Sequence, residues 1–148
     1  MGQIDFKIGT PEEIAKSRLL EERAKSSQPI RIFIAEPYKY WQDIYRREIG
    51  GIIGENNLVM AADYEQSRKI LASSPPFSAY VIEPKMHDGF GLAESIRQME
   101  ENSHTVVIVS SDDGLVGKAR EIGFKHVVEK NYKKPELSIK EIKKELGL

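Results

Sequence analysis

The chain has 148 residues, of which 40% are hydrophobic and 30% are charged, and its formal net charge is −1. This balance is typical of one globular domain and excludes the basic surface of a nucleic-acid-binding or membrane-binding protein. No apolar run approaches the roughly 20 residues that span a bilayer, and without cysteine the chain forms no disulfide or zinc–thiolate site. The first ten residues lack the basic start and apolar core of a signal peptide, so we expect a cytoplasmic protein.

A helix is predicted first, from Thr10 to about Lys25. Thr10 is a favourable N-cap, Pro11 suits the first helical position, and Glu13 completes a capping box. The apolar stripe of this helix is narrow, so it packs either on the surface of its own domain or against a partner. We therefore predict an N-terminal helical extension over residues 1–28 and a second, larger unit over residues 29–148.

From residue 30 onward, apolar strand-like runs alternate with amphipathic helical patterns. The predicted strands are Ile30–Ala35, Leu58–Ala61, Tyr80–Glu83, Thr105–Ser110 and His126–Val128. The predicted helices are Tyr38–Ile49, ended by Gly50–Gly51, then Glu65–Ala72, Leu92–Met99, Leu115–Ile122 and Pro135–Leu146, the last with Leu137, Ile139, Ile142 and Leu146 facing inward. Such alternation predicts an α/β fold in which helices cover both faces of a five-stranded parallel sheet.

In an open parallel sheet, ligands bind beyond the carboxyl ends of the strands, near the point where the strand order reverses. The side chains that leave the strands there are Glu36, Glu83, Ser110 and Lys130. We expect these two acids, the hydroxyl and the amine to converge on one edge of the sheet.

The segment Ala79–Leu92 resembles the phosphoacceptor strand of the receiver domain of two-component response regulators. In receivers that strand ends in Asp, with Met three residues on and Gly eight residues on; here Met86 and Gly91 keep those places and Glu83 replaces the Asp. The resemblance covers Arg31 to about Leu146. It implies a flavodoxin-like, receiver-like three-layer α/β/α sandwich, carrying the extra N-terminal helix.

The resemblance also implies roles for individual positions. Glu36–Pro37 stands where receivers have two adjacent Mg²⁺-binding acids, so one acid is lengthened and the other is lost. Ser110 and Lys130 keep the hydroxyl and the lysine of the phosphoacceptor pocket, whereas Val127 replaces the aromatic switch residue. His87 and Asn131 each replace a proline.

These departures bear on phosphoryl transfer itself. Mg²⁺ needs oxygen ligands in near-octahedral geometry at about 2.0–2.1 Å, and a misplacement of about 1 Å can cost roughly a hundredfold in rate. A lengthened carboxylate at Glu83 can instead lie against the ammonium of Lys130 as a permanent ion pair. Elsewhere, the histidines lack metal-ligand spacing, Asp112 is expected to cap the fourth helix, and no phosphate loop is present. We predict no catalytic residue, no bound metal and no cofactor.

The leading hypothesis is a pseudo-receiver: a non-enzymatic protein–protein interaction module of a two-component or other regulatory pathway that works without phosphorylation. By the resemblance, its protein partner, or a second copy of the chain, binds the face of the fourth helix, fifth strand and fifth helix, with the N-terminal helix as another docking surface. The alternative is an atypical receiver in which Glu83 or Asp88 is phosphorylated, or in which Glu36 and Glu83 bind a divalent ion. A flavodoxin-like small-ligand domain is a third hypothesis, and no loop motif supports it.

Overall fold

The structure is a computed structural model that describes residues 10–12, 29–99 and 105–148. Pro11 and Glu12 are helical. The rest of the predicted N-terminal helix, to about Lys25, lies outside the described residues. The extension over residues 1–28 and its docking role therefore stay predictions.

Five parallel strands form one sheet in the order β2-β1-β3-β4-β5. The strands are β1 (Ile32–Ala35), β2 (Leu58–Ala61), β3 (Ala79–Ile82), β4 (Thr105–Ser110) and β5 (His126–Glu129). All residues of β1 and β3 are buried, as expected for central strands covered on both faces. The five predicted strands are confirmed; β2 and β4 have the predicted bounds, and the ends of the other three differ by at most two residues.

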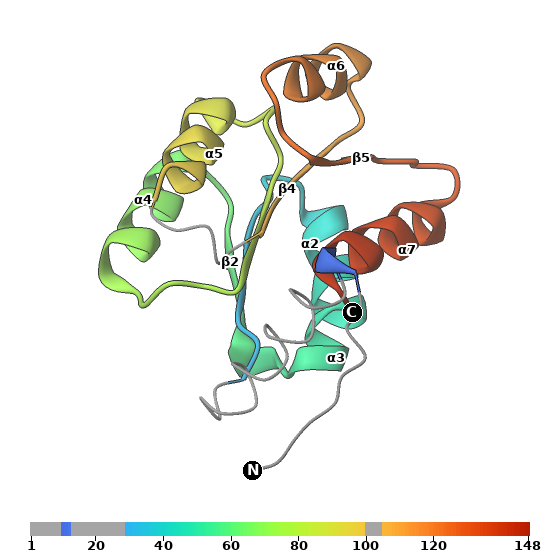
Figure 1. Ribbon diagram of the computed structural model, residues 1–148. Coiled ribbons are helices and arrows are strands. Elements are labelled where there is room, and N and C mark those ends of the chain that lie inside the picture. The colour runs from blue at the N-terminus through green and yellow to red at the C-terminus, as the bar shows by residue number, and fades with distance from the viewer. Residues whose placement is uncertain (1–9, 13–28, 100–104) are drawn as a thin grey trace.

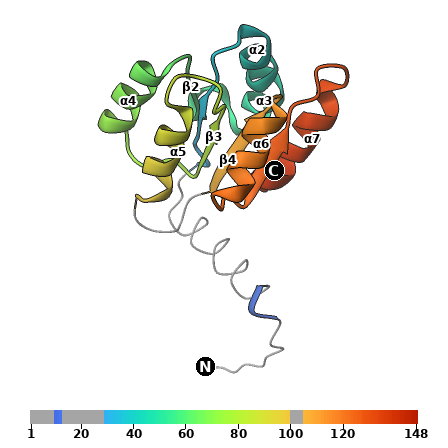
Figure 2. The ribbon, with the colours of Figure 1, turned by 90° about the horizontal axis from the view of Figure 1, so that it is seen from above.

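Helices cover both faces of the sheet, which makes three layers. They are α2 (Lys39–Glu48), α3 (Gly50–Ile53), α4 (Tyr64–Ser73), α5 (Gly89–Arg97), α6 (Asp113–Glu121) and α7 (Pro135–Leu146), with a short 3₁₀ turn η1 (Glu55–Asn57). Figures 1 and 2 show α4 and α5 on one side of the sheet and α2, α3 and α7 on the other. One apolar cluster joins α2 and α7 to the sheet, and a second joins α5 and α6 to its opposite face. The predicted flavodoxin-like, receiver-like sandwich is confirmed.

Two helices begin at aspartate caps. The Asp63 carboxylate accepts a hydrogen bond from the Gln66 amide at 2.8 Å, and the Asp112 carboxylate accepts one from the Leu115 amide at 3.1 Å. Each bond satisfies an amide that the helix itself leaves unpaired. The predicted capping role of Asp112 is confirmed.

One local prediction is confirmed and another was wrong. The helix predicted over Tyr38–Ile49 ends where expected, because α2 stops at Glu48 and Ile49 is its C-cap. The two glycines that follow are themselves helical, in α3, and Gly54, with φ of +95°, follows that turn. Packing of Ile53 against the core outweighs the low helix propensity of glycine. Leu137 does not face inward; it is 48% exposed. It lies two residues before buried Ile139, and thus about 200° away around the helix.

The strand order reverses between β1 and β3, so loops diverge from the carboxyl ends of these two strands. Ligands bind in such a crevice in open α/β sheets. Over the described ranges, no helix combines the length and apolar character needed to cross a bilayer.

Candidate functional site

Glu36 is the first residue after β1 and is buried, with 1% of its surface exposed. Its amide donates to the Ala61 carbonyl at 3.0 Å, which continues the β1–β2 ladder past the last strand residue. One carboxylate oxygen, Oε2, accepts from the Tyr38 amide at 3.1 Å. The turn into α2 therefore fixes this carboxylate inside the sheet edge.

Glu83 is the first residue after β3 and is equally buried. Its amide donates to the Ala35 carbonyl at 3.0 Å, so the main chain of β1 holds it in register. The Oε2 atom accepts from the Lys85 amide at 2.9 Å, and Oε1 accepts from the Lys130 ammonium at 2.6 Å. Both oxygens of the carboxylate thus have partners within the protein.

Lys130 follows β5 and joins the two glutamates. Its amide donates to the Ser110 carbonyl at 2.8 Å, and its Nζ atom lies 2.6 Å from Oε1 of both Glu36 and Glu83. The contact with Glu83 is a directed hydrogen bond, whereas the contact with Glu36 is an ion pair without hydrogen-bond alignment. The expected ion pair between Glu83 and Lys130 is confirmed, and Glu36 extends it to a triad.

The triad is electrostatically demanding because it holds two carboxylates and one ammonium away from water. Burial raises the pKa of Glu36, Lys130 opposes that rise, and the charge of Glu83 adds to it. The pKa of Tyr45 is raised well above its usual range, first by burial and then by the charges of Glu36 and Glu83. A proton is therefore held more tightly at Glu36 than at an exposed carboxyl group.

Tyr38 and Trp41 lie beside Lys130, and Tyr40 and Tyr132 pack against Trp41; we call these four side chains the aromatic cap. The Nζ atom of Lys130 lies 5.2 Å from the ring centroid of Trp41 and 5.4 Å from that of Tyr38, within cation–π range. Tyr132 stacks on Tyr40 with centroids 6.0 Å apart and meets Trp41 edge-on at 5.5 Å. The ammonium is thus held by rings as well as by carboxylates.

The aromatic cap was not predicted from the sequence. Its signal was present, because three of the rings follow β1 directly and the fourth follows Lys130 by two residues. The carboxyl ends of β1 and β5 meet at the same edge of the sheet, so aromatic residues just beyond both ends were candidates for contact.

The side chains of Ser110 and Val127 make other contacts than those of the triad. Ser110 is buried, and its hydroxyl accepts from the Asp112 amide at 3.2 Å, at the start of α6. Its link to Lys130 runs through the main chain. Val127 is half-buried and packs on the cluster that covers the α5–α6 side of the sheet. The structure therefore brings together Glu36, Glu83 and Lys130, with Ser110 adjacent through its carbonyl.

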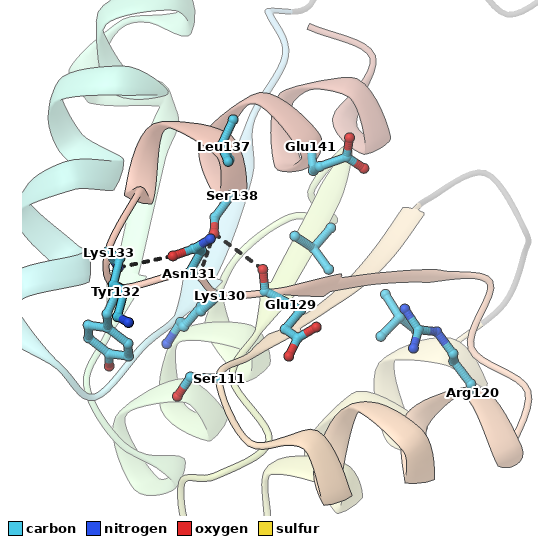
Figure 3. A pocket seen from close by; sticks show the side chains of 12 residues that line it. Ser111, Arg120, Glu129, Lys130, Asn131, Tyr132, Lys133, Leu137, Ser138 and Glu141 are labelled. Carbon is cyan, nitrogen blue, oxygen red and sulfur yellow. Dashed lines mark hydrogen bonds between the residues drawn. The ribbon is translucent and has the colours of Figure 1, made fainter.

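A groove of about 660 Å³ borders the triad on its β5 side (Figure 3). Side chains from α6, β5 and α7 line it, together with the loop that carries Tyr132 and Lys133. The exposed Leu137 lies on the α7 wall of the groove. Among residues 10–12, 29–99 and 105–148, no three His, Cys, Asp or Glu side chains are grouped so that they could hold a metal ion.

No protein-family model matches the sequence, and no curated protein matches it either. Among solved structures, a CheY-like response-regulator receiver domain from Methylobacillus flagellatus superposes with a TM-score of 0.62 at 17% identity, covering 80% of this chain and 99% of the other.

Two further matches have different described roles. The response regulator TrrA of Thermotoga maritima, solved with Mg²⁺ and beryllofluoride, gives a TM-score of 0.59 at 17% identity over 79% of this chain and 98% of its own. A structure described as adenylate cyclase from Rhodopirellula baltica gives a TM-score of 0.60 at 13% identity, covering 80% of this chain and 90% of its own. At these identities the comparisons establish the receiver-like fold alone.

Proposed function

We propose that the chain is a pseudo-receiver, a signalling module with a receiver-like fold that binds protein partners without being phosphorylated. The observation that carries this proposal is the occupation of all four carboxylate oxygens of Glu36 and Glu83. Two of them contact the Lys130 ammonium and two accept backbone amides. To turn toward a metal ion or a phosphoryl group, either carboxylate would have to give up its contact with Lys130.

Charge supports the same proposal. Receivers, by the resemblance, gather three acids around Mg²⁺, whereas here Pro37 replaces one of them and the remaining two share the lysine. Phosphoryl transfer depends mainly on positioning and on neutralising the charge of the phosphoryl group. With its ammonium held by two carboxylates, Lys130 lacks the freedom to turn toward an incoming phosphoryl group.

The switch positions also favour a fixed surface. The Ser110 hydroxyl accepts from the Asp112 amide, and Val127 provides no ring to move in response to it. We infer that the face formed by α6, β5 and α7 is presented in one arrangement. Its groove and the exposed Leu137 make it the face on which a protein partner, or a second copy of the chain, would bind.

The alternative is an atypical receiver that is still phosphorylated. It is favoured by the presence of Ser110 and Lys130, and by the exposure of Asp88, a second acid in the loop after β3. In this alternative Glu83 would have to leave Lys130, or Asp88 would have to accept the phosphoryl group without the buried lysine.

Incubation with Mg²⁺ and acetyl phosphate, followed by intact-protein mass spectrometry, separates the two functions. We expect no phosphorylated species from the wild-type chain. A variant with Glu36→Asp, Pro37→Asp and Glu83→Asp restores the acids of the resemblance and serves as the matched control. An acyl phosphate mapped to Glu83 or Asp88 of the wild-type chain would overturn the proposal in favour of the alternative.

A further inference from the structure

Exposed apolar side chains gather at one end of the molecule. Tyr38, Tyr40 and Tyr132 of the aromatic cap are 39%, 49% and 50% exposed, and Leu137 borders the same loop. The other large hydrophobic side chains exposed among the described residues, Ile52 and Met99, belong to α3 and to the turn after α5. Tyrosine supplies large, rigid contact area at low conformational cost, so a cluster of it on a surface is typical of a binding site.

The loop that carries Tyr132 is held in a defined conformation. The Asn131 side-chain carbonyl accepts from the amides of Lys133 and Lys134 at 3.0 and 2.9 Å. The Asn131 backbone N–H donates to the Ser138 hydroxyl at 2.6 Å, and that hydroxyl donates to the Glu129 backbone carbonyl at 3.2 Å. Figure 3 shows Tyr132 and Lys133 beside the groove. Because the loop is ordered in advance, a ligand that binds it loses less entropy.

The charge around the cap is positive. Lys133 and Lys134 are both exposed, and within the described part of the chain neither forms an ion pair. They directly precede α7, whose amino-terminal end adds positive potential. By contrast, Lys39 is paired with Asp43 at 3.2 Å, and the acids of the triad are buried beneath the rings.

Three exposed acids lie near this charge. Glu136, in the first turn of α7, lines a hollow on the side of α7 facing α2, and Glu129 and Glu141 line the groove that Tyr132 and Lys133 also border. The surface formed by the cap and the two lysines is therefore aromatic and cationic, with these acids at its margin.

We propose that the aromatic cap together with Lys133 and Lys134 binds an acidic peptide segment of a protein partner. Aromatic rings of the segment would stack on Tyr40 and Tyr132, and its carboxylates would pair with the two lysines, neither of which forms an ion pair within the described residues. The inference rests on the proposed function in that both require a protein partner. It adds a second surface, which shares Tyr132 and Lys133 with the groove of the α6–β5–α7 face, and states the chemistry of what binds there.

Selection from a phage-displayed library of random linear peptides against the full chain tests this inference. We expect the selected peptides to be enriched in Asp and Glu. In ¹⁵N heteronuclear spectra, the synthesised peptides should shift the amides of Tyr38, Tyr40, Tyr132, Lys133 and Lys134. Affinity should fall as salt is raised, since surface ion pairs are screened.

Variants give the decisive comparison. Tyr132→Ala should weaken binding of the selected peptides by about tenfold or more, and Lys133→Glu with Lys134→Glu should weaken it similarly. The control carries Ile52→Ala and Lys125→Glu, which remove an exposed apolar side chain and reverse an exposed charge elsewhere, and it should bind as the wild type does.

Peptides that are not acidic, or that bind the control and the test variants equally, overturn the inference. If the peptides fail while the wild-type chain also stays unphosphorylated by acetyl phosphate, only this second surface is wrong. If the wild-type chain becomes phosphorylated at Glu83, the proposed function fails whatever the peptides do.

Discussion

The Lys130 ammonium lies 2.6 Å from Oε1 of Glu83, and this contact ties the end of β5 to the end of β3 across the intervening strand β4. The second carboxylate oxygen of Glu83, Oε2, accepts from the Lys85 amide, so both oxygens are held by hydrogen bonds. A side chain one methylene longer than aspartate thus spans the distance to the lysine without a metal between them. This contact makes the edge of the sheet a structural centre of the domain.

The first prediction concerns the lysine. Replacing it by methionine, Lys130→Met, leaves two buried carboxylates without a cation, and removal of one partner from a buried ion pair typically costs about 3–5 kcal/mol. Urea unfolding should show that loss. The control is Lys143→Met, which breaks a half-exposed pair with Glu48 at 3.2 Å and should cost less than about 1 kcal/mol. Equal losses in the two variants would mean that the triad does not stabilise the fold.

The second prediction is a rescue. Adding Glu36→Gln and Glu83→Gln to Lys130→Met removes all the buried charge, and such neutral replacements are often no less stable than the original pair. The triple variant should therefore recover most of the free energy of unfolding that Lys130→Met loses. A triple variant as unstable as the single one would indicate that the lysine acts through its ring contacts with Trp41 and Tyr38.

The third prediction is a pH dependence. Burial raises the pKa of Glu36 in the folded chain, so between its ordinary and its raised pKa the folded state binds more protons than the unfolded state. The free energy of unfolding should therefore fall as pH rises through that window. Glutamine has no titratable proton, so Glu36→Gln should remove this contribution to the pH dependence of the free energy of unfolding. Urea unfolding at a series of pH values measures it.

Glu48 provides a control of opposite sign. Hydrogen bonds from Arg47 and then Lys143 lower the pKa of its carboxyl group. Its contribution to stability is present above the ordinary pKa and is lost as pH falls through the lowered one. Glu48→Gln should therefore flatten the acidic side of the profile. A Glu36→Gln profile that matches the wild type would contradict the raised pKa.

The fourth prediction concerns the loop that follows Glu83. A Cβ atom at Gly89 would lie 2.6 Å from the Pro84 Cα atom, so Gly89→Ala must push the backbone of this loop apart. Overpacking of this kind typically costs about 1–3 kcal/mol. Gly117→Ala is the matched control, because its Cβ meets nothing within 4 Å and alanine favours the helix. Thermal unfolding should show Gly89→Ala destabilised and Gly117→Ala unchanged or stabilised.

The alternation of strands and helices could be predicted because each strand is a short apolar run and the helices are amphipathic. The convergence of Glu36, Glu83 and Lys130 followed from topology, since parallel strands end at one edge. The same topology made the aromatic residues beyond β1 and β5 candidates for contact, but the stacking of Tyr40 on Tyr132 depends on how α2 and the β5–α7 loop pack. At Leu137 the local pattern misled, because tertiary packing decides which face of α7 is buried.

We propose that Lys130 fills the pocket around Glu36 and Glu83 and that the pocket does not respond to phosphorylation. The decisive test is titration of the ¹⁵N-labelled chain with Mg²⁺, and then with beryllofluoride as an acyl-phosphate mimic. The positive control is the variant with Glu36→Asp, Pro37→Asp and Glu83→Asp. We expect the amides of Glu36, Glu83, Ser110 and Lys130 to stay still in the wild type and to shift in the control. Saturable shifts at a stoichiometric site in the wild-type chain would contradict the claim.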